Sequence, residues 1–226
     1  MSLLAYQEPT NPWWSWRYVR DNVETIRGAF TDHVVLTVES VAIAALIAIP
    51  LAVLAYWVRP LATPILASAG VLYTIPSLGL FAILAPVLGS GTTMVVTALV
   101  LYALLVIVRT ALTGLLQVPA DVLEAATGMG YGRWGRLLRV ELPLALPGLL
   151  TGLRLATVST VALVTVGALV GEGGLGGLIV SGFRNNFYKA QIATATLLCV
   201  ALALVLDLAL AMLGRALTPW ARRAAS

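Results

Sequence analysis

Reactive and charged side chains are scarce in this chain of 226 residues. It has one cysteine, Cys199, and one histidine, His33, and only 11% of its residues are charged. A single cysteine excludes an internal disulfide, and the isolated histidine favours an interfacial position over a metal or proton-transfer role. No Gly-rich loop ends in Gly-Lys-Ser or Gly-Lys-Thr, so the usual cradle for nucleotide phosphates is missing. We predict no catalytic residue, no metal site and no cofactor bound by this chain.

Apolar side chains dominate the sequence instead. Hydrophobic residues make up 60% of it, too many for a soluble domain of this length. A helix needs about twenty residues to cross about 30 Å of hydrocarbon. Five apolar segments are long enough, and they run approximately over residues 34–58, 61–88, 92–116, 144–170 and 190–213. The sequence therefore predicts an all-α, polytopic membrane protein with about five transmembrane helices in contact with membrane lipids.

Basic residues indicate which side of the membrane faces the cytoplasm. One side carries Arg59, Arg109, Arg133, Arg136, Arg139, Arg154, Arg215, Arg222 and Arg223. The other carries Arg17, Arg20, Arg27, Arg184 and Lys189, mixed with Glu8, Asp21, Glu24, Asp32 and Glu172. We therefore expect the N terminus outside and the C terminus inside. The net charge of +4 comes from arginines that flank apolar segments instead of forming one patch, which argues against a nucleic-acid partner.

Residues 1–33 form a segment ahead of the predicted spans. They have no continuous apolar core and so do not resemble a cleavable signal peptide. Asn11 can cap a helix that has Pro12 at its first position. Apolar residues then recur every three or four positions, at Trp16, Val19, Val23, Ile26 and Phe30. Such a helix would lie along the outer membrane surface or pack on the outer face of the protein.

The predicted domain organisation follows from these segments. An extracytoplasmic N-terminal amphipathic segment covers residues 1–33, a transmembrane domain covers residues 34–214, and a cytoplasmic tail covers residues 215–226. A cytoplasmic loop at residues 117–143 lies within the transmembrane domain.

The second predicted span contains several residues that interrupt helical hydrogen bonding. These are Pro64, Gly70, Pro76, Gly79 and Pro86. Interrupted backbone is tolerated at membrane depth only where protein or cavity water satisfies the freed groups. The pattern fits a broken helix beside a transport path and equally fits a kinked packing helix without solute contact.

The loop at residues 117–143 is a polar, Arg-rich island that predicts two short helices. Pro119 can begin the first helix, and Gly128 with Gly130 can end it. Val122, Ala125, Ala126 and Met129 would form a slim apolar ridge that fits a groove on a partner. The second helix carries Arg133, Arg136 and Arg139 as a cationic stripe, suited to anionic headgroups or an acidic partner surface.

The same loop carries a recognisable spacing pattern. The segment EAATGMGYGRWGRLLRVELP matches E-A-A, three residues, G, nine residues, I-x-L-P, with Val in the place of Ile. The matching residues are Glu124, Ala125, Ala126, Gly130, Val140, Leu142 and Pro143. This pattern resembles the cytoplasmic coupling loop of ABC importer permeases. The resemblance implies that the loop docks onto an ATPase subunit, which would bind ATP and Mg.

Three further segments resemble osmoprotectant permeases for glycine betaine, carnitine and choline. They are YTIPSLGLFAILAPVLGSG from Tyr73, LYALLVIVRTALTGL from Leu101 and GALVGEGGLGGLI from Gly167, where Glu172 replaces a usually small residue. The resemblance implies a MetI-like permease fold in a bacterial cytoplasmic membrane. It also implies two ATPase subunits, a second permease, identical or paralogous, and an extracytoplasmic solute-binding protein. An amino-acid permease of the same class and an ion-driven secondary transporter are the alternatives.

Polar residues within the spans give the remaining candidate sites. Tyr73, Ser77 and Thr165 are candidates for the solute path, although such hydroxyls commonly bond their own helix backbone. An unpaired carboxylate at membrane depth is costly, so Asp207 needs a partner. Arg154 lies at a comparable depth, and we predict that the two pair and hold the fourth and fifth spans together. In the competing interpretation, Asp207 binds coupling protons.

Overall fold

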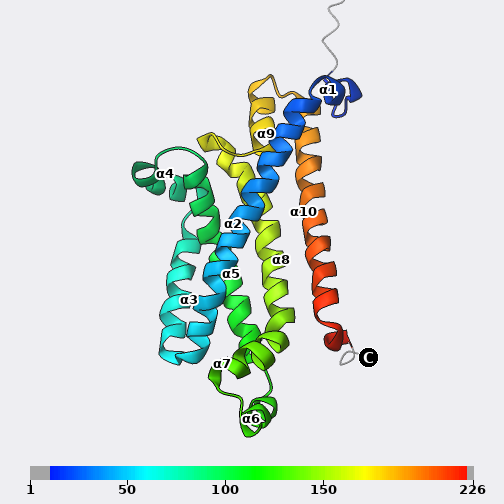
Figure 1. The fold of residues 1–226 in the computed structure, drawn as a ribbon. Helices are drawn as coiled ribbons and strands as arrows, with labels where there is room; N and C mark the ends of the chain where they lie inside the picture. Colours follow the sequence, from blue (N-terminus) through cyan, green and yellow to red (C-terminus); the bar gives the residue numbers. More distant parts are fainter. Residues whose placement is uncertain (1–10, 223–226) are drawn as a thin grey trace, which may run out of the picture.

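The computed structural model describes residues 11–222, and within this range the chain is helical with no strand (Figure 1). The long helices are α2 (Val23–Trp57), α5 (Thr92–Leu116), α8 (Leu142–Gly167) and α10 (Lys189–Leu217). Between α2 and α5 lie α3 (Arg59–Thr74) and α4 (Ser77–Leu88). The shorter elements are α1 (Trp16–Asp21), α6 (Ala120–Gly128), α7 (Arg133–Arg136), η1 (Leu137–Glu141), η2 (Ala168–Val170), α9 (Leu175–Arg184) and η3 (Pro219–Arg222). Residues 1–10 of the predicted N-terminal segment and 223–226 of the predicted tail lie outside the described residues.

The predicted spans correspond to helices of sufficient length and hydropathy. Among the described residues, four helices qualify as membrane spans, and a fifth span results if the bent pair of α3 and α4 is counted as one. The first span is longer than predicted, because α2 has 35 residues and begins at Val23. At 1.5 Å per residue it is about 52 Å long, so its ends extend beyond about 30 Å of hydrocarbon.

The predicted amphipathic helix from Asn11 is wrong in its start and extent. The helix α1 begins after Ser15, whose Oγ accepts a hydrogen bond from the Tyr18 N–H at 3.2 Å. The Asn11 amide instead donates to the Phe187 carbonyl at 2.9 Å and accepts from the Lys189 N–H at 3.0 Å. It therefore satisfies an N–H at the start of α10, one of the groups that a helix end leaves without an intrahelical partner.

The predicted apolar face of that helix is also divided. The chain changes direction at Asn22, between α1 and α2, so residues on either side do not share one face. Ile26 is buried against Tyr18 and Ala190, whereas Trp16 is 65% exposed. Residues from Val23 onward are the first turns of the long α2, and they do not form a separate surface helix.

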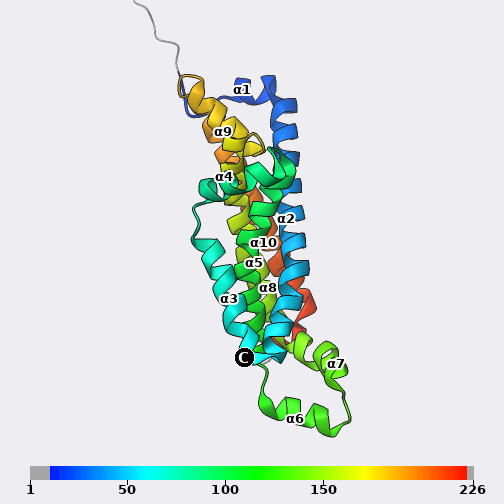
Figure 2. The same ribbon diagram turned by 90° about the vertical axis from the view of Figure 1, so that its left-hand side faces the viewer.

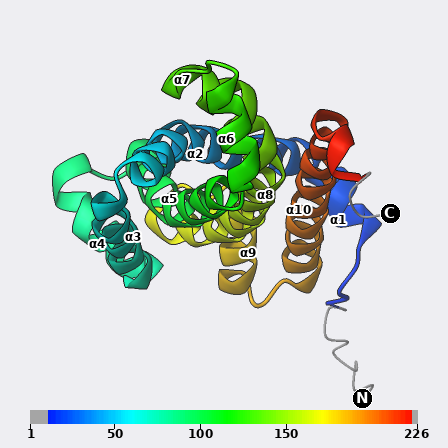
Figure 3. The same cartoon turned by 90° about the horizontal axis from the view of Figure 1, so that it is seen from below.

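The bundle is centred on α5. About two thirds of its apolar span is buried, compared with 6% for α10. The helix α2 packs against this core through Ala44, Ala48, Ala52 and Ala55, which are all buried. Small residues at spacings of three and four let helix backbones approach closely in membrane proteins. Seen along the bundle in Figure 3, α3 and α4 lie on one side of α5, and α10 lies on the other side.

Glycines allow α5 and α8 to approach most closely near the end of the bundle that carries α6 and α7. A Cβ added at Gly148 would lie 3.2 Å from the Gly114 Cα. One added at Gly152 would lie 1.7 Å from the Thr110 Oγ1. A side chain at Gly152 would overlap Thr110, and one at Gly148 would be a tight contact. The loop that joins them is therefore attached to a tightly packed helix pair.

The second span is broken at one of its prolines, Pro76. The helices α3 and α4 are bent by 100° at the break around Ile75 and Pro76. Tyr102, on α5, donates a hydrogen bond from its hydroxyl to the Ile75 carbonyl. A protein side chain thus satisfies a backbone group that the break exposes, as irregular backbone at membrane depth requires.

The connections alternate between the two ends of the bundle. In Figures 1 and 2, α1, α4 and α9 lie toward one end, whereas α6, α7 and η3 lie toward the other. The described N-terminal and C-terminal parts are thus at opposite ends, in agreement with an odd number of passes. The loop predicted to be cytoplasmic lies at the same end as the C-terminal η3.

Candidate functional site

The helix α6 carries the first three residues of the spacing pattern. It has nine residues, follows Pro119 and has Asp121 in its first turn, where a negative charge favours the helix dipole. Glu124 and Ala125 are exposed at the end of the bundle. Ala126 is only 1% exposed, so the prediction that it belongs to the outward ridge is wrong. Its methyl group faces the chain itself, and a partner can reach Glu124 and Ala125.

A tight turn around Gly130 ends α6. Gly130 has φ +82°, its N–H donates to the Thr127 carbonyl at 3.0 Å, and the Tyr131 N–H donates to the Ala126 carbonyl at 3.1 Å. These two bonds and a left-handed glycine form a Schellman motif, a common way to end a helix. Gly130 therefore sets the angle at which the chain leaves α6 and enters α7.

The second half of the pattern forms one continuous helical path into the membrane. The helix α7 runs into the π-helical turn η1, which runs into α8. Pro143 lies in the first turn of α8 and has no N–H to donate, so the α-helical hydrogen-bond pattern cannot run uninterrupted through this point. Leu142 packs beside Leu115, Leu137 and Ala145, and Val140 is half-buried. The prediction did not anticipate the π turn.

The three arginines of the predicted cationic stripe have different surroundings. The guanidinium of Arg133 lies 4.2 Å from the ring centroid of Trp57, at the end of α2, where Trp134 also packs edge-on at 4.6 Å. Arg136 forms an ion pair with Glu141, and Arg139 is exposed. The stripe is therefore not one free cationic surface, because two of its members bind groups of the same chain.

Glu141 is the residue of this region that sequence reasoning missed. Its side chain is fully buried, and its Oε1 accepts from the Arg136 Nε at 2.6 Å. A buried carboxylate needs a cationic partner, so an acid at the entrance of an apolar span was a signal. The arginine five positions earlier was the matching partner.

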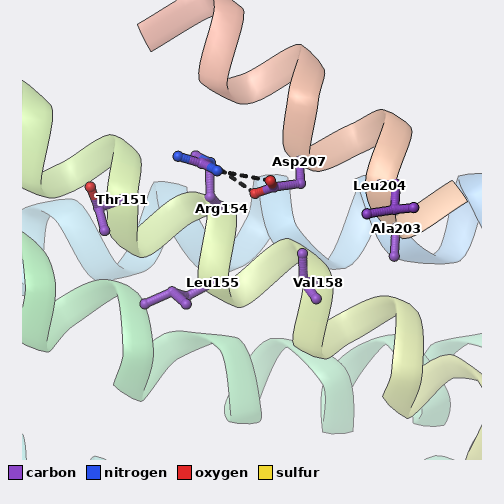
Figure 4. A pocket seen from close by; sticks show the side chains of 7 residues that line it. All are labelled: Thr151, Arg154, Leu155, Val158, Ala203, Leu204 and Asp207. Atoms are coloured by element: carbon purple, nitrogen blue, oxygen red, sulfur yellow. Dashed lines mark hydrogen bonds and ion pairs between the residues drawn. The ribbon is translucent and has the colours of Figure 1, made fainter. Parts of the chain in front are cut away.

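The predicted partners Arg154 and Asp207 meet between α8 and α10 (Figure 4). The Arg154 Nε donates to Asp207 Oδ1 and its Nη2 donates to Oδ2, each at 2.8 Å. A cavity of about 400 Å³ lies beside the pair, lined also by Thr151, Leu155, Val158, Ala203 and Leu204. Because both carboxylate oxygens accept from one guanidinium, the geometry matches an ion pair that joins two helices.

The predicted path residues are not brought together into one site. Tyr73 is 46% exposed near the end of α3, where its ring lies 5.8 Å from that of Tyr102. Ser77 is the first residue of α4, after the break. The Thr165 hydroxyl donates to the carbonyl of Ala162 on its own helix at 2.6 Å, which is the common alternative for such a residue.

His33 is fully buried against α8, which sequence reasoning did not anticipate. Its Nε2 lies 3.1 Å from the Val161 carbonyl of α8. This contact joins α2 to α8. Within residues 11–222, no group of three or more His, Cys, Asp or Glu side chains could hold a metal ion.

Comparison with known proteins gives a consistent result. The family described as binding-protein-dependent transport system inner membrane component matches residues 43–223. The chain is 39% identical over 207 residues to the osmoprotectant import permease protein OsmW of Salmonella typhimurium. This alignment covers 89% of this chain and 96% of OsmW. It is 36% identical over 202 residues to the glycine betaine/carnitine/choline transport system permease protein OpuCD of Bacillus subtilis, which covers 89% and 88%, respectively.

A solved structure shares the fold. A chain of the MetNI methionine ABC transporter in an inward-facing conformation superposes with a TM-score of 0.77 at 24% identity. The superposition covers 90% of this chain and 99% of that one. It shows that the chain has a MetI-like fold. With the family match and the close relatives, it follows that the chain belongs to the binding-protein-dependent transport system inner membrane components.

Proposed function

We propose that this chain is the membrane permease of an ATP-driven importer and that α6 is the element that docks onto the ATPase. One observation carries the proposal: a nine-residue helix projects from the end of the bundle with Glu124 and Ala125 exposed. These residues belong to the spacing pattern of importer permeases. The small side chain of Ala125 leaves room for the helix to enter a groove on a partner.

The orientation of the chain follows from its charges. Several arginines lie in the parts of the helices that are near the α6 end of the bundle. They are Arg59 at the start of α3, Arg109 and Arg215 in the later parts of α5 and α10, and Arg139 in η1. An excess of arginine is typical of the cytoplasmic side. We therefore place α6, η3 and the C terminus in the cytoplasm, where ATP is available, and the N terminus outside.

The other subunits that we propose are those that an ATP-driven importer needs. The sequence has no phosphate-binding loop, so ATP and Mg are assigned to two separate ATPase subunits. A second permease, identical or paralogous, would complete the transmembrane path, and an extracytoplasmic binding protein would deliver the solute. Closure of the ATPase pair would then move α6 and, through it, the spans.

The solute class is proposed from the relatives, whose names specify osmoprotectants, glycine betaine, carnitine and choline. A quaternary ammonium group is usually held by several aromatic rings around one point. Within the described spans, Tyr73 pairs with Tyr102 at 5.8 Å and Trp57 pairs with Trp134 at 4.6 Å, and neither pair includes a third ring. We therefore assign most of the selectivity to the binding protein and a weakly selective path to the permease.

Two alternatives make different predictions. An amino-acid permease would belong to the same kind of importer complex but would receive its solute from a different binding protein. A proton-driven carrier would need an acid able to exchange protons, but the candidate acid, Asp207, accepts from Arg154 through both oxygens. We therefore favour the ATP-driven importer.

Uptake into proteoliposomes tests the proposal. The chain is reconstituted with its ATPase, a second permease and the binding protein, and uptake of labelled glycine betaine is measured with and without ATP. We expect uptake to require ATP, and Glu124→Ala to reduce the solute moved per ATP. Glu24→Ala is the matched control, because Glu24 is an exposed acid at the opposite end. Uptake driven by an ion gradient alone, or a fully active Glu124→Ala variant, would contradict the proposal.

A further inference from the structure

The side chain of Arg136 joins two elements that the chain itself connects only through a turn. Its Nε donates to Glu141 Oε1 at 2.6 Å, at the end of the π turn η1. Its Nη1 donates to the Thr127 Oγ1 at 3.2 Å, on α6. One guanidinium therefore bridges the proposed docking helix and the base of the α8 span.

The covalent connection between α6 and α7 is short and mostly exposed. It consists of residues 129–132, and the two backbone bonds of the turn at Gly130 hold it in place. The helix α7 itself is held to the end of α2 by Arg133 and Trp134, which pack on Trp57. A displacement of α6 that opens these two bonds would be absorbed in the turn unless another contact transmits it.

The ion pair at Glu141 is well suited to transmit it. Glu141 is fully buried, and its Oε2 has no hydrogen-bond partner among residues 11–222. Its negative charge therefore depends on Arg136, and separating the two would leave an uncompensated buried charge. The π turn at residues 137–141 includes Glu141 itself, and π turns inside α-helices are frequent at functional sites.

We propose that Arg136 and Glu141 are positioning residues that couple α6 to α8 through Thr127. When α6 moves with the ATPase, Thr127 pulls on the guanidinium, and the guanidinium carries Glu141 and the start of α8 with it. The proposal rests on the proposed function, because it requires that α6 be driven by ATP hydrolysis. It adds a direct side-chain route from that helix into the membrane.

Thr127→Val is the cleanest test. It removes the hydroxyl that Arg136 binds, keeps the shape of the side chain, and affects an exposed position, so folding should be preserved. We expect the solute transported per ATP hydrolysed to fall by about two- to tenfold, as for loss of one hydrogen bond. Thr113→Val is the matched control: Thr113 is also exposed and bonds only its own helix, at the Arg109 carbonyl.

Two further variants test the route through the guanidinium. Arg136→Lys keeps the positive charge but loses the planar guanidinium, whose N–H groups contact Glu141 and Thr127 at the same time. Glu141→Gln keeps the shape of the side chain but loses its negative charge. We expect both to lower the transport per ATP. Because all three residues form one chain of contacts, Thr127→Val in the Glu141→Gln background should cause no additional loss.

The readouts separate this proposal from a structural role and from the proposed function. A merely structural role would reduce protein yield or ATPase binding and leave the transport per ATP unchanged. If the wild type and Thr113→Val show ATP-driven uptake while Thr127→Val and Arg136→Lys match them in transport per ATP, the coupling route is overturned and the proposed function stands. If the wild type shows no ATP-driven uptake, the proposed function itself is overturned.

Discussion

Replacing Gly130 by alanine perturbs the end of α6, the proposed docking helix, through the backbone alone. Gly130 has φ +82°, a conformation that side-chain-bearing residues rarely adopt, and an added Cβ would meet no atom within 4 Å. The substitution therefore causes no clash, and its cost is conformational. For a residue with a Cβ in the left-handed region this cost is about 1 to 2 kcal/mol.

That cost acts on the equilibrium between the formed and the opened turn. The turn is held by the bonds from Gly130 to Thr127 and from Tyr131 to Ala126. A cost of about 1 to 2 kcal/mol changes such an equilibrium by about 5- to 30-fold. If the ATPase binds only the formed turn and that turn becomes the minor state, the apparent affinity falls in proportion to its population. The upper limit of the loss is therefore about 30-fold, with the five spans still inserted.

The assay is a titration of the permease in nanodiscs with its isolated ATPase subunit. Gly132→Ala is the matched control, because Gly132 lies two residues away with φ −70° and also has no atom within 4 Å of an added Cβ. We expect weaker binding for Gly130→Ala and unchanged binding for Gly132→Ala. Equal affinities for the two variants would refute the role given to the left-handed turn.

Two further predictions concern the spans. Asp207→Asn should abolish uptake, because it breaks the link between α8 and α10. The charge-swapped double variant Arg154→Asp, Asp207→Arg should recover uptake. If uptake by the double variant stays at the level of Asp207→Asn, the pairing is refuted. Tyr102→Phe should lower the stability of the purified protein by about 1 to 3 kcal/mol, because the Ile75 carbonyl loses its hydroxyl partner. Thermal unfolding measures this loss, and Tyr73→Phe, at an exposed ring, is the control. Equal melting temperatures for the two Phe variants would contradict the second prediction.

The spans were predictable because length and hydropathy determine them, but the effect of each proline was not. Pro50 lies inside α2 and Pro147 inside α8, and both helices continue past them. At Pro76 the chain breaks and bends by 100°. Part of the difference lies in Tyr102, which satisfies the carbonyl before the break from another helix. Such a partner lies far away in the sequence and is not visible in the local pattern.

The helix α6 was predictable from local signals, and the surroundings of the arginines that follow it were not. Pro119 and Gly130 are local signals, and α6 lies between them as expected. The three arginines were predicted as one stripe because they recur at every third position. Their actual surroundings depend on residues from elsewhere, namely Trp57 for Arg133 and the buried Glu141 for Arg136. Periodicity shows which residues share a helix face, but it does not show which charges that face meets.

Two ion pairs attach α8 to its neighbours, which makes it the helix through which the proposed coupling would run. Glu141 ties the start of this helix to α6 through Arg136, and Arg154, farther along the same helix, ties it to Asp207 on α10. The close approach between α5 and α8 at Gly148 and Gly152 lies between these two attachments. In the proposed coupling, a displacement that enters at Glu141 would reach Arg154 through this closely packed segment. The ion pair would then pass it to α10, whose apolar span is only 6% buried.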